Sequence, residues 1–367
     1  MCLTTVAPDK AMRRYPRLGD SVDLRPRCLI GLLCLLPGVL AAAEPTGPAP
    51  TLSLVVDSIR HEITVTIGPF DVPAMPSGAD GHAAHEHVMP RYSEEFVWPV
   101  NGFGRGFTLQ LTDSAGHAVT RRALHHIVIE NKGRRQLMMP VSERLLAAGR
   151  ETGNLMLPSS IGLPLAVGSP MKAVTMWHNE TGAELRGVTL RLVIRYMPPS
   201  QMPRPLPVLP FTFDVEDKIG LPNTFDIPPG PSERSRDFVM PVDGRVLGVS
   251  GHMHDYAVAL RLEDVATGKV VIRLPVRTDS VGKILNVPIK YYGIVGDGLR
   301  LYGGKRYRLV AVYNNPTAAT QSGAMAHLDG LLSPTKISAW PAVGSPEMAY
   351  QDAPDTVKAT AEAHHHH

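Results

Sequence analysis

The chain has 367 residues and a formal net charge of +3, and 44% of its residues are hydrophobic. This length predicts about two domains, and the hydrophobic content excludes an intrinsically disordered chain. Residues 1–27 contain six Lys or Arg and three Asp or Glu, so the rest of the chain contains 31 residues of each sign. A neutral body has no electrostatic signature of nucleic-acid or anionic-lipid binding, and we expect neither partner.

The N-terminal segment has the three parts of an export signal. The basic stretch Arg25–Arg27 precedes an apolar run of 13 residues, Cys28–Leu40, and the small residues Ala41–Ala43 follow. An apolar run of this length is short for a transmembrane helix. We therefore predict a signal peptide at 1–43, cleavage near Ala43, and an exported chain, periplasmic or secreted, without stable membrane insertion. An uncleaved membrane anchor is the alternative.

All three cysteines, Cys2, Cys28 and Cys34, lie before the predicted cleavage site. The mature chain would then contain no cysteine. This excludes disulfides, thiolate metal sites and a cysteine nucleophile.

Beyond residue 44, alternating apolar and polar residues predict β-strands. The clearest strand is Val188–Tyr196, in which every second residue is apolar. Further predicted strands are Leu52–Ile67 (two strands around Ser58–Glu62), Phe107–Leu111 before a turn at Asp113–Gly116, the hairpin Ala257–Glu263 with Lys269–Leu274, and Arg306–Tyr313. The glycines of Gly102–Gly106 predict a β-bulge. Only Ser142–Ala148 predicts a short helix.

A proline-rich segment divides the body of the chain. Six of the fourteen residues from Met197 to Pro210 are proline, which predicts a stiff, extended linker. We therefore predict an all-β fold with two antiparallel jelly-roll or β-sandwich domains in tandem, at 44–204 and 205–345, and a flexible tail at 346–367.

Histidines in strand-like segments are the strongest chemical signal. His252 and His254 alternate, so both project from one face of a strand, about 7 Å apart. His125 and His126 are adjacent and can share a metal only at a strand end, at a bulge, or through Nδ1 of one ring. His178 lies in a mostly apolar run. The alternatives are surface polar positions for the pairs and a hydrogen-bonded core residue for His178.

The order of these histidines, followed by Met325, resembles the copper type II ascorbate-dependent monooxygenases, the family of the peptidylglycine α-hydroxylating and dopamine β-monooxygenases. The resemblance spans about 95–332 and includes Met176–His178 and the 73-residue spacing from His252 to Met325. It implies two jelly-roll domains with one copper each. The implied ligands are His125, His126 and His178 for one copper, and His252, His254 and Met325 for the other. By this resemblance, the first copper relays an electron, and the second, with its three ligands as catalytic residues, binds O₂ and hydroxylates a C–H bond.

The ligand types themselves favour copper. A His₂Met set joins two borderline nitrogens to a soft thioether, which suits a metal that cycles between Cu(I) and Cu(II). A His₃ set alone suits zinc and copper equally. The predicted cofactors are therefore two copper ions, with ascorbate or another one-electron donor.

Two positions differ from the peptide-amidating branch of the family. Its arginine two residues before His-x-His is Ser250 here, and its tyrosine four residues after the methionine is Asp329. An acid would repel a substrate carboxylate, so a glycine-extended peptide is not the expected substrate, and the substrate stays open between a small molecule and another peptide.

Two other function classes stay open. One is a non-enzymatic periplasmic copper-binding or copper-trafficking protein on the same fold, although a carrier would not need the full His₃ set. The other is a carbohydrate- or protein-binding sandwich with incidental histidines.

Further histidines lie outside the two implied ligand sets. The loop with His82, His85 and His87 is either a copper-capture site or a solvated loop. His327, two residues after Met325, is a reserve ligand. We assign no function to the terminal run His364–His367.

Overall fold

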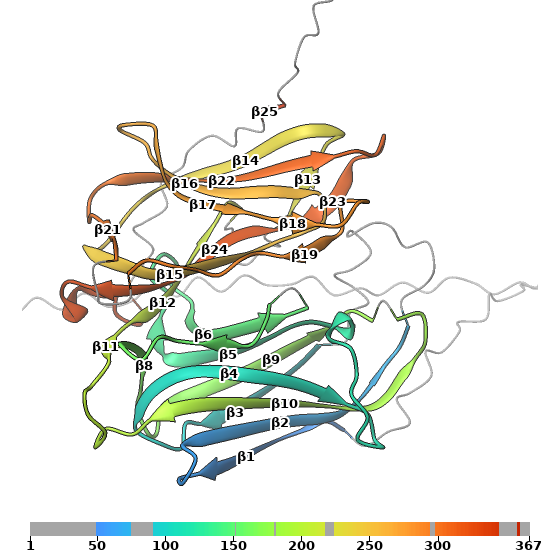
Figure 1. Cartoon of the computed structure of the whole chain (residues 1–367), viewed down its shortest axis with the longest axis vertical. Helices are drawn as coiled ribbons and strands as arrows, with labels where there is room; N and C mark the ends of the chain where they lie inside the picture. The colour runs from blue at the N-terminus through green and yellow to red at the C-terminus, as the bar shows by residue number, and fades with distance from the viewer. Residues whose placement is uncertain are drawn as a thin grey trace, which may run out of the picture. The chain divides into compact units, whose positions relative to one another are not determined.

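The computed structural model describes residues 49–74, 91–150, 152–179, 181–216, 224–293, 298–344 and 358–359. The predicted signal peptide, the histidine loop at 82–87 and the terminal histidines lie outside these ranges. The described residues form β-strands with two short 3₁₀ turns, η2 (Arg121–Ala123) and η3 (Ile337–Ala339), and contain no α-helix (Figure 1). The predicted all-β class is confirmed. Within the described ranges, no helical segment is long and apolar enough to span a bilayer.

Strands β1–β11, which we call the N-terminal half, form a sandwich of two sheets. One sheet has the order β1-β2-β10-β4-β8-β11 with β7 beside β4, and the other has the order β3-β9-β5-β6. The strands are β1 (Thr51–Asp57), β2 (Glu62–Val72), β3 (Arg91–Val97), β4 (Gly102–Thr112), β5 (Leu124–Arg135), β6 (Ser142–Gly149), β7 (Leu155–Met156), β8 (Ile161–Leu165), β9 (Pro170–Trp177), β10 (Leu185–Met197) and β11 (Leu206–Pro207). The predicted alternation in β10 is confirmed, since Val188, Leu190 and Leu192 are fully buried between the sheets.

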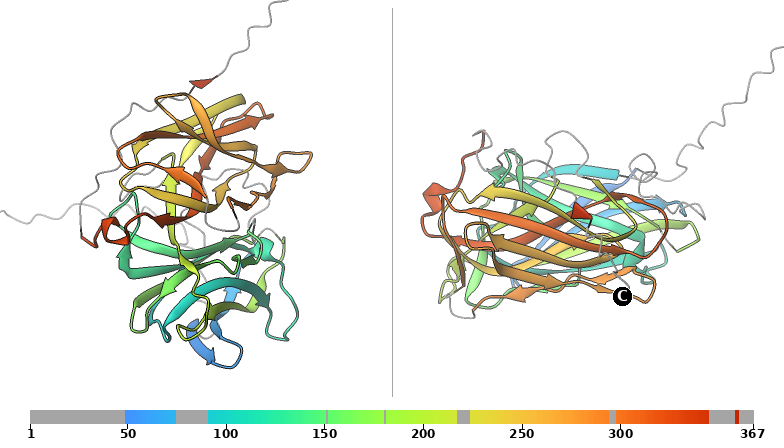
Figure 2. Two further views of the ribbon diagram at one scale, coloured as in Figure 1. Left: turned by 60° about the vertical axis from the view of Figure 1, so that its left-hand side comes forward. Right: turned by 90° about the horizontal axis from the view of Figure 1, so that it is seen from above.

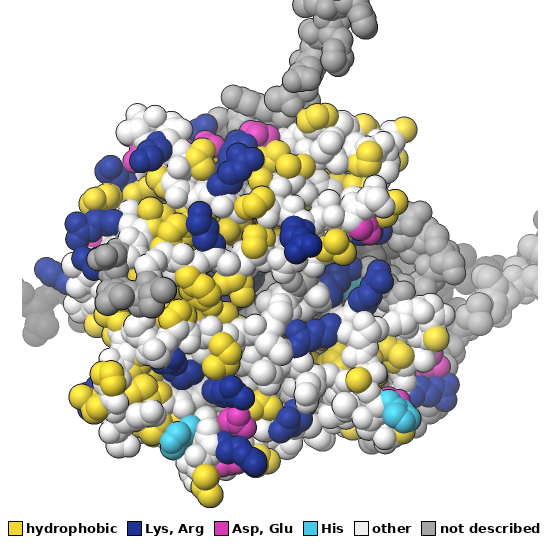
Figure 3. All heavy atoms as spheres, in the orientation of Figure 1, with side chains coloured by type: hydrophobic (Ala, Val, Ile, Leu, Met, Phe, Trp, Pro, Cys, Tyr) yellow, Lys and Arg dark blue, Asp and Glu magenta, His cyan; other side chains and the backbone are white. Residues whose placement is uncertain are grey.

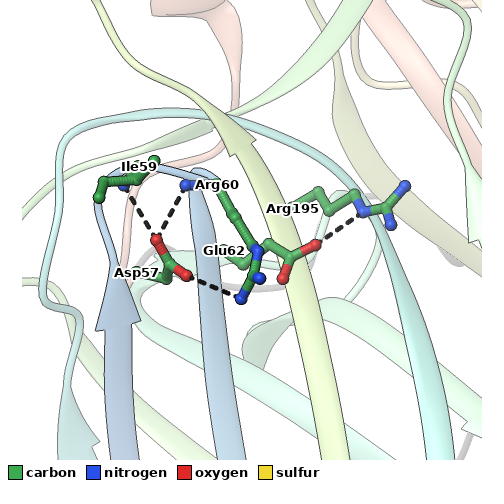
Figure 4. Close-up of polar contacts among 5 residues, drawn as sticks. All are labelled: Asp57, Ile59, Arg60, Glu62 and Arg195. Carbon is green, nitrogen blue, oxygen red and sulfur yellow. Dashed lines mark hydrogen bonds and ion pairs between the residues drawn. The ribbon is translucent and has the colours of Figure 1, made fainter.

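The turn between β1 and β2 has a local polar cause. Asp57 Oδ1 accepts hydrogen bonds from the backbone N–H groups of Ile59 (3.0 Å) and Arg60 (2.9 Å) (Figure 4). This is the way an aspartate initiates a tight turn. Arg195 on β10 pairs with Glu62 at 3.1 Å, which holds the start of β2 against its neighbour (Figure 4).

The predicted bulge in the glycine-rich part of β4 is also present. Opposite β10, Gly106 pairs with Arg195 and Gly104 pairs with Tyr196, so Arg105 is an extra residue. Gly106 has a φ of 139°, and a Cβ there would lie 2.1 Å from a backbone oxygen of β7. Only glycine therefore fits this position.

Strands β12–β25, which we call the C-terminal half, form a second stack of sheets (Figure 2). The two larger sheets have the orders β12-β24-β15-β20, with β21 beside β15, and β17-β16-β22-β14-β25, and the pairs β13–β23 and β18–β19 form two small sheets. The strands are β12 (Leu209–Asp214), β13 (Phe225–Ile227), β14 (Gly230–Val239), β15 (Gly244–Met253), β16 (Ala257–Asp264), β17 (Lys269–Pro275), β18 (Arg277–Thr278), β19 (Ile284–Asn286), β20 (Lys290–Tyr291), β21 (Leu299–Leu301), β22 (Arg306–Asn315), β23 (Gln321–Ala324), β24 (Ala326–Pro334) and β25 (Lys358–Ala359). The predicted hairpin is the antiparallel pair β16–β17.

The predicted helix at Ser142–Ala148 is wrong, because this segment is strand β6, paired with β5. Glu143 and Leu145 are buried, whereas Arg144 and Leu146 are only partly buried. The residue types favour a helix, but pairing with β5 and this two-residue alternation override local propensity.

The proline-rich segment contributes strands at sheet edges. Leu206–Pro207 extends the seven-stranded sheet next to β8, and β12, which begins at Leu209, is an edge strand of the C-terminal half. Both positions agree with the expectation that proline excludes central strands. The segment is therefore partly built into the sheets and does not run as a separate extended linker.

The two halves share packing. Leu137–Met139 of the N-terminal half lie in the hydrophobic core of the C-terminal half. Trp340 Nε1 donates a hydrogen bond to the carbonyl oxygen of Arg135 at 2.9 Å. The described residues all belong to one compact unit. The tandem division at 204/205 therefore stays a prediction. Within the predicted tail, Lys358–Ala359 pairs with β14.

Charged side chains do not gather on one part of the visible surface. In Figure 3, Lys and Arg side chains lie scattered among hydrophobic and polar ones, with fewer acidic side chains between them. The histidines that the sequence predicts as ligands, together with a cavity, lie instead where β5 and β6 of the N-terminal half meet β15 and β24 of the C-terminal half.

Candidate metal centre

A β-bulge brings the adjacent histidines of β5 to one place. Opposite β9, Leu124 pairs with Trp177 and His126 pairs with Met176, so His125 is the extra residue. The ring centroids of His125 and His126 are 4.8 Å apart. A bulge re-aims a side chain that would otherwise point to the opposite face of the sheet. It is one of the conditions under which the sequence allows these two neighbours to share a site.

The second pair lies at the end of β15. His252 Nε2 and His254 Nε2 are 3.1 Å apart, and His254 is 5% exposed. Met253 between them points the other way and is buried in the core of the C-terminal half. The predicted same-face arrangement of the histidines is therefore present.

Histidines from the two halves form one cluster. One ring nitrogen each of His125, His252 and His254 lies within 4.8 Å of the others. The ring of His125 is 6.0 Å from that of His252 and 6.2 Å from that of His254. The sequence places His125 in a different ligand set from the other two, and spacing alone gives no sign of this contact. The division into two centres, one per half, stays a prediction.

The remaining predicted ligands lie in the same neighbourhood. His178 follows β9, is 7% exposed, and its ring is 6.3 Å from that of His125. Its backbone N–H donates to the carbonyl oxygen of Ala123, which fixes the chain at this point. Met325, between β23 and β24, lines the same cavity as His125 and His252. Three of the six predicted ligands thus form the cluster, His126 and His178 lie next to His125, and Met325 lines the adjoining cavity.

The three clustered imidazoles suit a metal ion. Metal–nitrogen bonds of about 2.0–2.1 Å at a tetrahedral angle place two nitrogens about 3.3 Å apart, close to the distance between His252 and His254. Burial, with further contributions from His126 and His252, holds the pKa of His125 well below its usual value. A neutral imidazole is the form that binds metal. A thioether beside such nitrogens favours copper over zinc.

Tyr313 connects the two segments that bear the predicted reactive-site ligands. Its hydroxyl donates to the carbonyl oxygen of Met325 at 2.8 Å and accepts from the backbone N–H of His254. The side chain is 1% exposed, and burial raises its pKa far above the usual value, so the phenol stays protonated. The sequence around Tyr313 does not reveal this bridge.

His327, the predicted reserve ligand, lies beside His252 and Asp329. Its ring stacks on that of His252 with centroids 5.0 Å apart, and its Nδ1 lies 3.0 Å from Asp329 Oδ2. Burial opposes a charge on His327, but Asp329 outweighs it and raises the pKa of the imidazole. A carboxylate beside one ring nitrogen leaves the other nitrogen able to bind a metal. The contact with Asp329 is therefore compatible with a ligand, and the reserve role of His327 stays a prediction.

Asp255 anchors the end of the His252–His254 segment. It is 5% exposed and accepts a hydrogen bond from the backbone N–H of Ile284 at 2.9 Å. It also pairs with Lys283 at 3.0 Å and with Arg150 of the N-terminal half at 4.0 Å. These contacts give Asp255 a positioning role at a turn.

A cavity of about 240 Å³ adjoins the cluster. His125, His126, His252 and Met325 line it, and most other lining residues are apolar or glycine. The apolar walls include Phe107, Leu146, Leu163, Phe211, Ile289 and Leu331. The cavity and the histidines together define an all-β sandwich protein with a candidate metal centre beside an apolar chamber.

Comparison with known proteins leaves the family open. No protein-family model and no curated protein sequence matches the chain. Among solved structures, the major capsid protein P2 of bacteriophage PM2 is 12% identical, covering 75% of this chain and 98% of that one with a TM-score of 0.32. PNGase F, a glycosylasparaginase from Flavobacterium meningosepticum, is 10% identical, covering 81% and 99% with a TM-score of 0.34. At these scores neither likeness bears on function, which has to be argued from the side chains.

Proposed function

We propose that this protein is an exported, copper-dependent monooxygenase that hydroxylates a C–H bond of its substrate with O₂ and a one-electron donor such as ascorbate. The observation that supports this most is the cluster of His125, His252 and His254 at the wall of an apolar cavity that Met325 also lines. Imidazole nitrogens with a thioether suit copper in both of its common oxidation states. The sequence resemblance to the copper type II monooxygenases points the same way.

The reaction divides O₂ between substrate and water. One oxygen atom enters the C–H bond, and the other leaves as water with two protons and two electrons supplied by the donor. Copper, when bound, supplies the one-electron exchange with O₂. The chain keeps His125 neutral, holds the backbone of His254 and Met325 through Tyr313, and places apolar cavity walls beside the histidines.

The cavity favours an enzyme over a copper carrier. A carrier needs ligands that a partner can reach and has no use for an apolar cavity beside them. A hydroxylase must hold a hydrocarbon group against its metal, and an apolar chamber next to the ligands does this.

The test is anaerobic loading with copper followed by O₂ uptake. We expect two copper ions per chain after dialysis, and uptake with ascorbate that rises with substrate and matches the alcohol formed. The control is the variant His252→Ala/His254→Ala, which corrects for oxidation of ascorbate by free copper. Retained copper without substrate-dependent uptake would indicate the carrier, and copper lost on dialysis would contradict both functions. Export is tested separately by the mass of the mature chain, which we expect to begin near residue 44.

A further inference from the structure

One arginine stands out in the apolar wall of the cavity. Arg144 on β6 is partly buried and lines the cavity together with His125, His126 and His252. No described residue forms a hydrogen bond or a close ion pair with its guanidinium group. A guanidinium is always charged and has five N–H donors in a planar fork. Arg144 therefore presents unused donors beside an apolar space.

Three other polar residues of the wall, Asp329, Thr212 and Ser250, have close polar neighbours of their own. Asp329 is the only acidic residue among the described lining residues, and both of its oxygens have partners. Thr212 Oγ1 donates to Oδ1 at 2.8 Å, and His327 Nδ1 lies 3.0 Å from Oδ2. Ser250 Oγ points to the carbonyl oxygen of Val287 at 3.4 Å. Asp329 would repel an anion if it stood alone, but these contacts offset its charge, and its attraction to Arg144 acts without a close contact.

Arg144 and the histidines lie at different positions along the same strand pair. On β5 and β6, Gly149 is opposite His126, and Arg144 is opposite Glu130. Five residues of an antiparallel strand span about 17 Å. Along the cavity wall, the cationic side chain of Arg144 is therefore followed by a stretch that includes Leu145 and Leu146, and then by the histidines of the candidate metal centre.

We propose that this cavity binds an aliphatic carboxylate, with the carboxylate on Arg144 and the hydrocarbon chain along the apolar wall toward the histidines. A carboxylate accepts two parallel hydrogen bonds from one guanidinium, and the apolar wall adds the burial of each methylene. This inference rests on the proposed function for one point only, the reaction of the bound ligand. The ligand carbons nearest the histidines would be the ones hydroxylated. Binding itself requires no metal.

The test measures binding to the metal-free protein by isothermal titration calorimetry. The probes are octanoate, octan-1-ol and octylamine, which share one chain and differ in the head group. We expect octanoate to bind at least about tenfold more tightly than either of the others, the usual effect of a charge-assisted hydrogen bond. From hexanoate to decanoate, each methylene should tighten binding about fourfold.

Substitution at Arg144 identifies the head-group site. Arg144→Met should remove the preference for octanoate and leave octan-1-ol binding unchanged, and Arg144→Lys should retain part of the preference. The matched control is Arg191→Met, an exposed arginine on β10 outside the cavity, which should bind like the wild type. Equal binding of the three probes, no gain with chain length, or an unchanged preference in a folded Arg144→Met variant would overturn the proposal.

The copper-loaded protein separates this proposal from the proposed function. Arg144-dependent binding without octanoate-dependent O₂ uptake would leave the carboxylate site standing and reject hydroxylation of this ligand. Copper-dependent hydroxylation of other compounds, without carboxylate binding, would support the proposed function and reject the carboxylate site.

Discussion

The loop after β9 and the loop after β22 are built alike, although they belong to different halves of the molecule. Asn179 begins one and Asn315 the other, and each is 1% exposed. Each asparagine accepts a hydrogen bond from a backbone N–H two residues later and donates one to a carbonyl oxygen four residues later. The partners are Thr181 (3.0 Å) and Ala183 (2.8 Å) in the first loop, and Thr317 (3.0 Å) and Ala319 (2.9 Å) in the second.

The two loops differ in the residue just before the asparagine. In the N-terminal half it is His178, buried and facing His125, whereas in the C-terminal half it is Asn314, which is exposed. The backbone N–H of Asn314 donates to the carbonyl oxygen of Tyr256. The comparison shows one local framework used twice, with a potential ligand at the equivalent position of only one half. The potential ligand and the asparagine that holds the loop are therefore different residues, and substitutions can test each of them separately.

The largest expected effect comes from the residue that differs. His178→Ala should remove one of two bound copper ions, because a three-histidine set loses a third of its donors. Asn314→Ala, at the equivalent position of the other loop, should keep both. Metal analysis after dialysis measures the copper content. Full copper content in His178→Ala would show that His178 is a core histidine and that the loops do not differ in chemistry.

The second expected effect concerns the pair on β15. His252→Ala should also remove one copper and leave the set of His125, His126 and His178 filled. This test is informative because His125, assigned to one ligand set, lies close to His252 and His254 of the other. Loss of both ions in a variant that still unfolds cooperatively would show a single shared centre in place of two.

The third effect concerns the framework that the loops share. Asn179→Ala and Asn315→Ala should each lower the free energy of unfolding by about 2–4 kcal/mol, because each leaves buried backbone groups without their partner. Urea unfolding measures this, with Asn314→Ala as the exposed control at about 0.5 kcal/mol or less. If only one of the two substitutions leaves the free energy of unfolding unchanged, the loops share their geometry but do not contribute equally to stability.

Most strands could be predicted from the sequence, because a sheet with one buried face leaves a two-residue period, as in β10. Strand β6 could not, since its residues favour a helix and only pairing with β5 selects the strand. The bulge at Gly102–Gly106 could be predicted because glycine is needed there.

The candidate site could be predicted in its parts but not in its assembly. The spacing of His252 and His254 predicts a shared face, which β15 provides. The contact of His125 with them depends on how the two halves pack, and no local pattern encodes that. The contacts of Tyr313 and the place of Arg144 in the cavity wall depend on tertiary packing, so their sequence surroundings give no sign of either role.

The two methionines near the site give the fourth test. Met325→Ile keeps the approximate volume, so the free energy of unfolding should change by less than about 1.5 kcal/mol. A thioether stabilises Cu(I) more than Cu(II), so Cu(I) affinity should fall about tenfold while Cu(II) still binds. Met253→Ile, which faces the core, should leave both affinities unchanged. A competing Cu(I) chelator measures the affinity, and equal values for wild type and Met325→Ile would make Met325 a packing residue only.

The smallest expected effect uses a buried carboxyl group of the N-terminal half to ask whether the halves unfold together. Glu143 is fully buried, and its Oε2 accepts hydrogen bonds from Arg134 (2.8 Å) and Asn131 (3.3 Å). Its Oε1 is buried and has no hydrogen-bond partner among the described residues. Burial raises the pKa of Glu143 above its ordinary value of 4.5, against the opposing effect of Arg134.

A raised pKa in the folded state makes this group destabilising at high pH. Between pH 4.5 and the raised value, the folded chain holds a proton that the unfolded chain has released, so stability falls as the pH rises through that window. Glu143→Gln cannot titrate and should lose this decline, while its amide oxygen can still accept both hydrogen bonds. At pH 7 the free energy of unfolding of the variant should differ from that of the wild type by about 1 kcal/mol or less.

Urea unfolding from pH 4 to 8 measures how the free energy of unfolding changes with pH, with tryptophan fluorescence and far-UV circular dichroism as two probes. If the halves unfold as one unit, both probes should report the same change in slope. A change confined to one probe would show that the N-terminal half unfolds on its own, and an unchanged slope would show that Glu143 titrates normally in the folded protein.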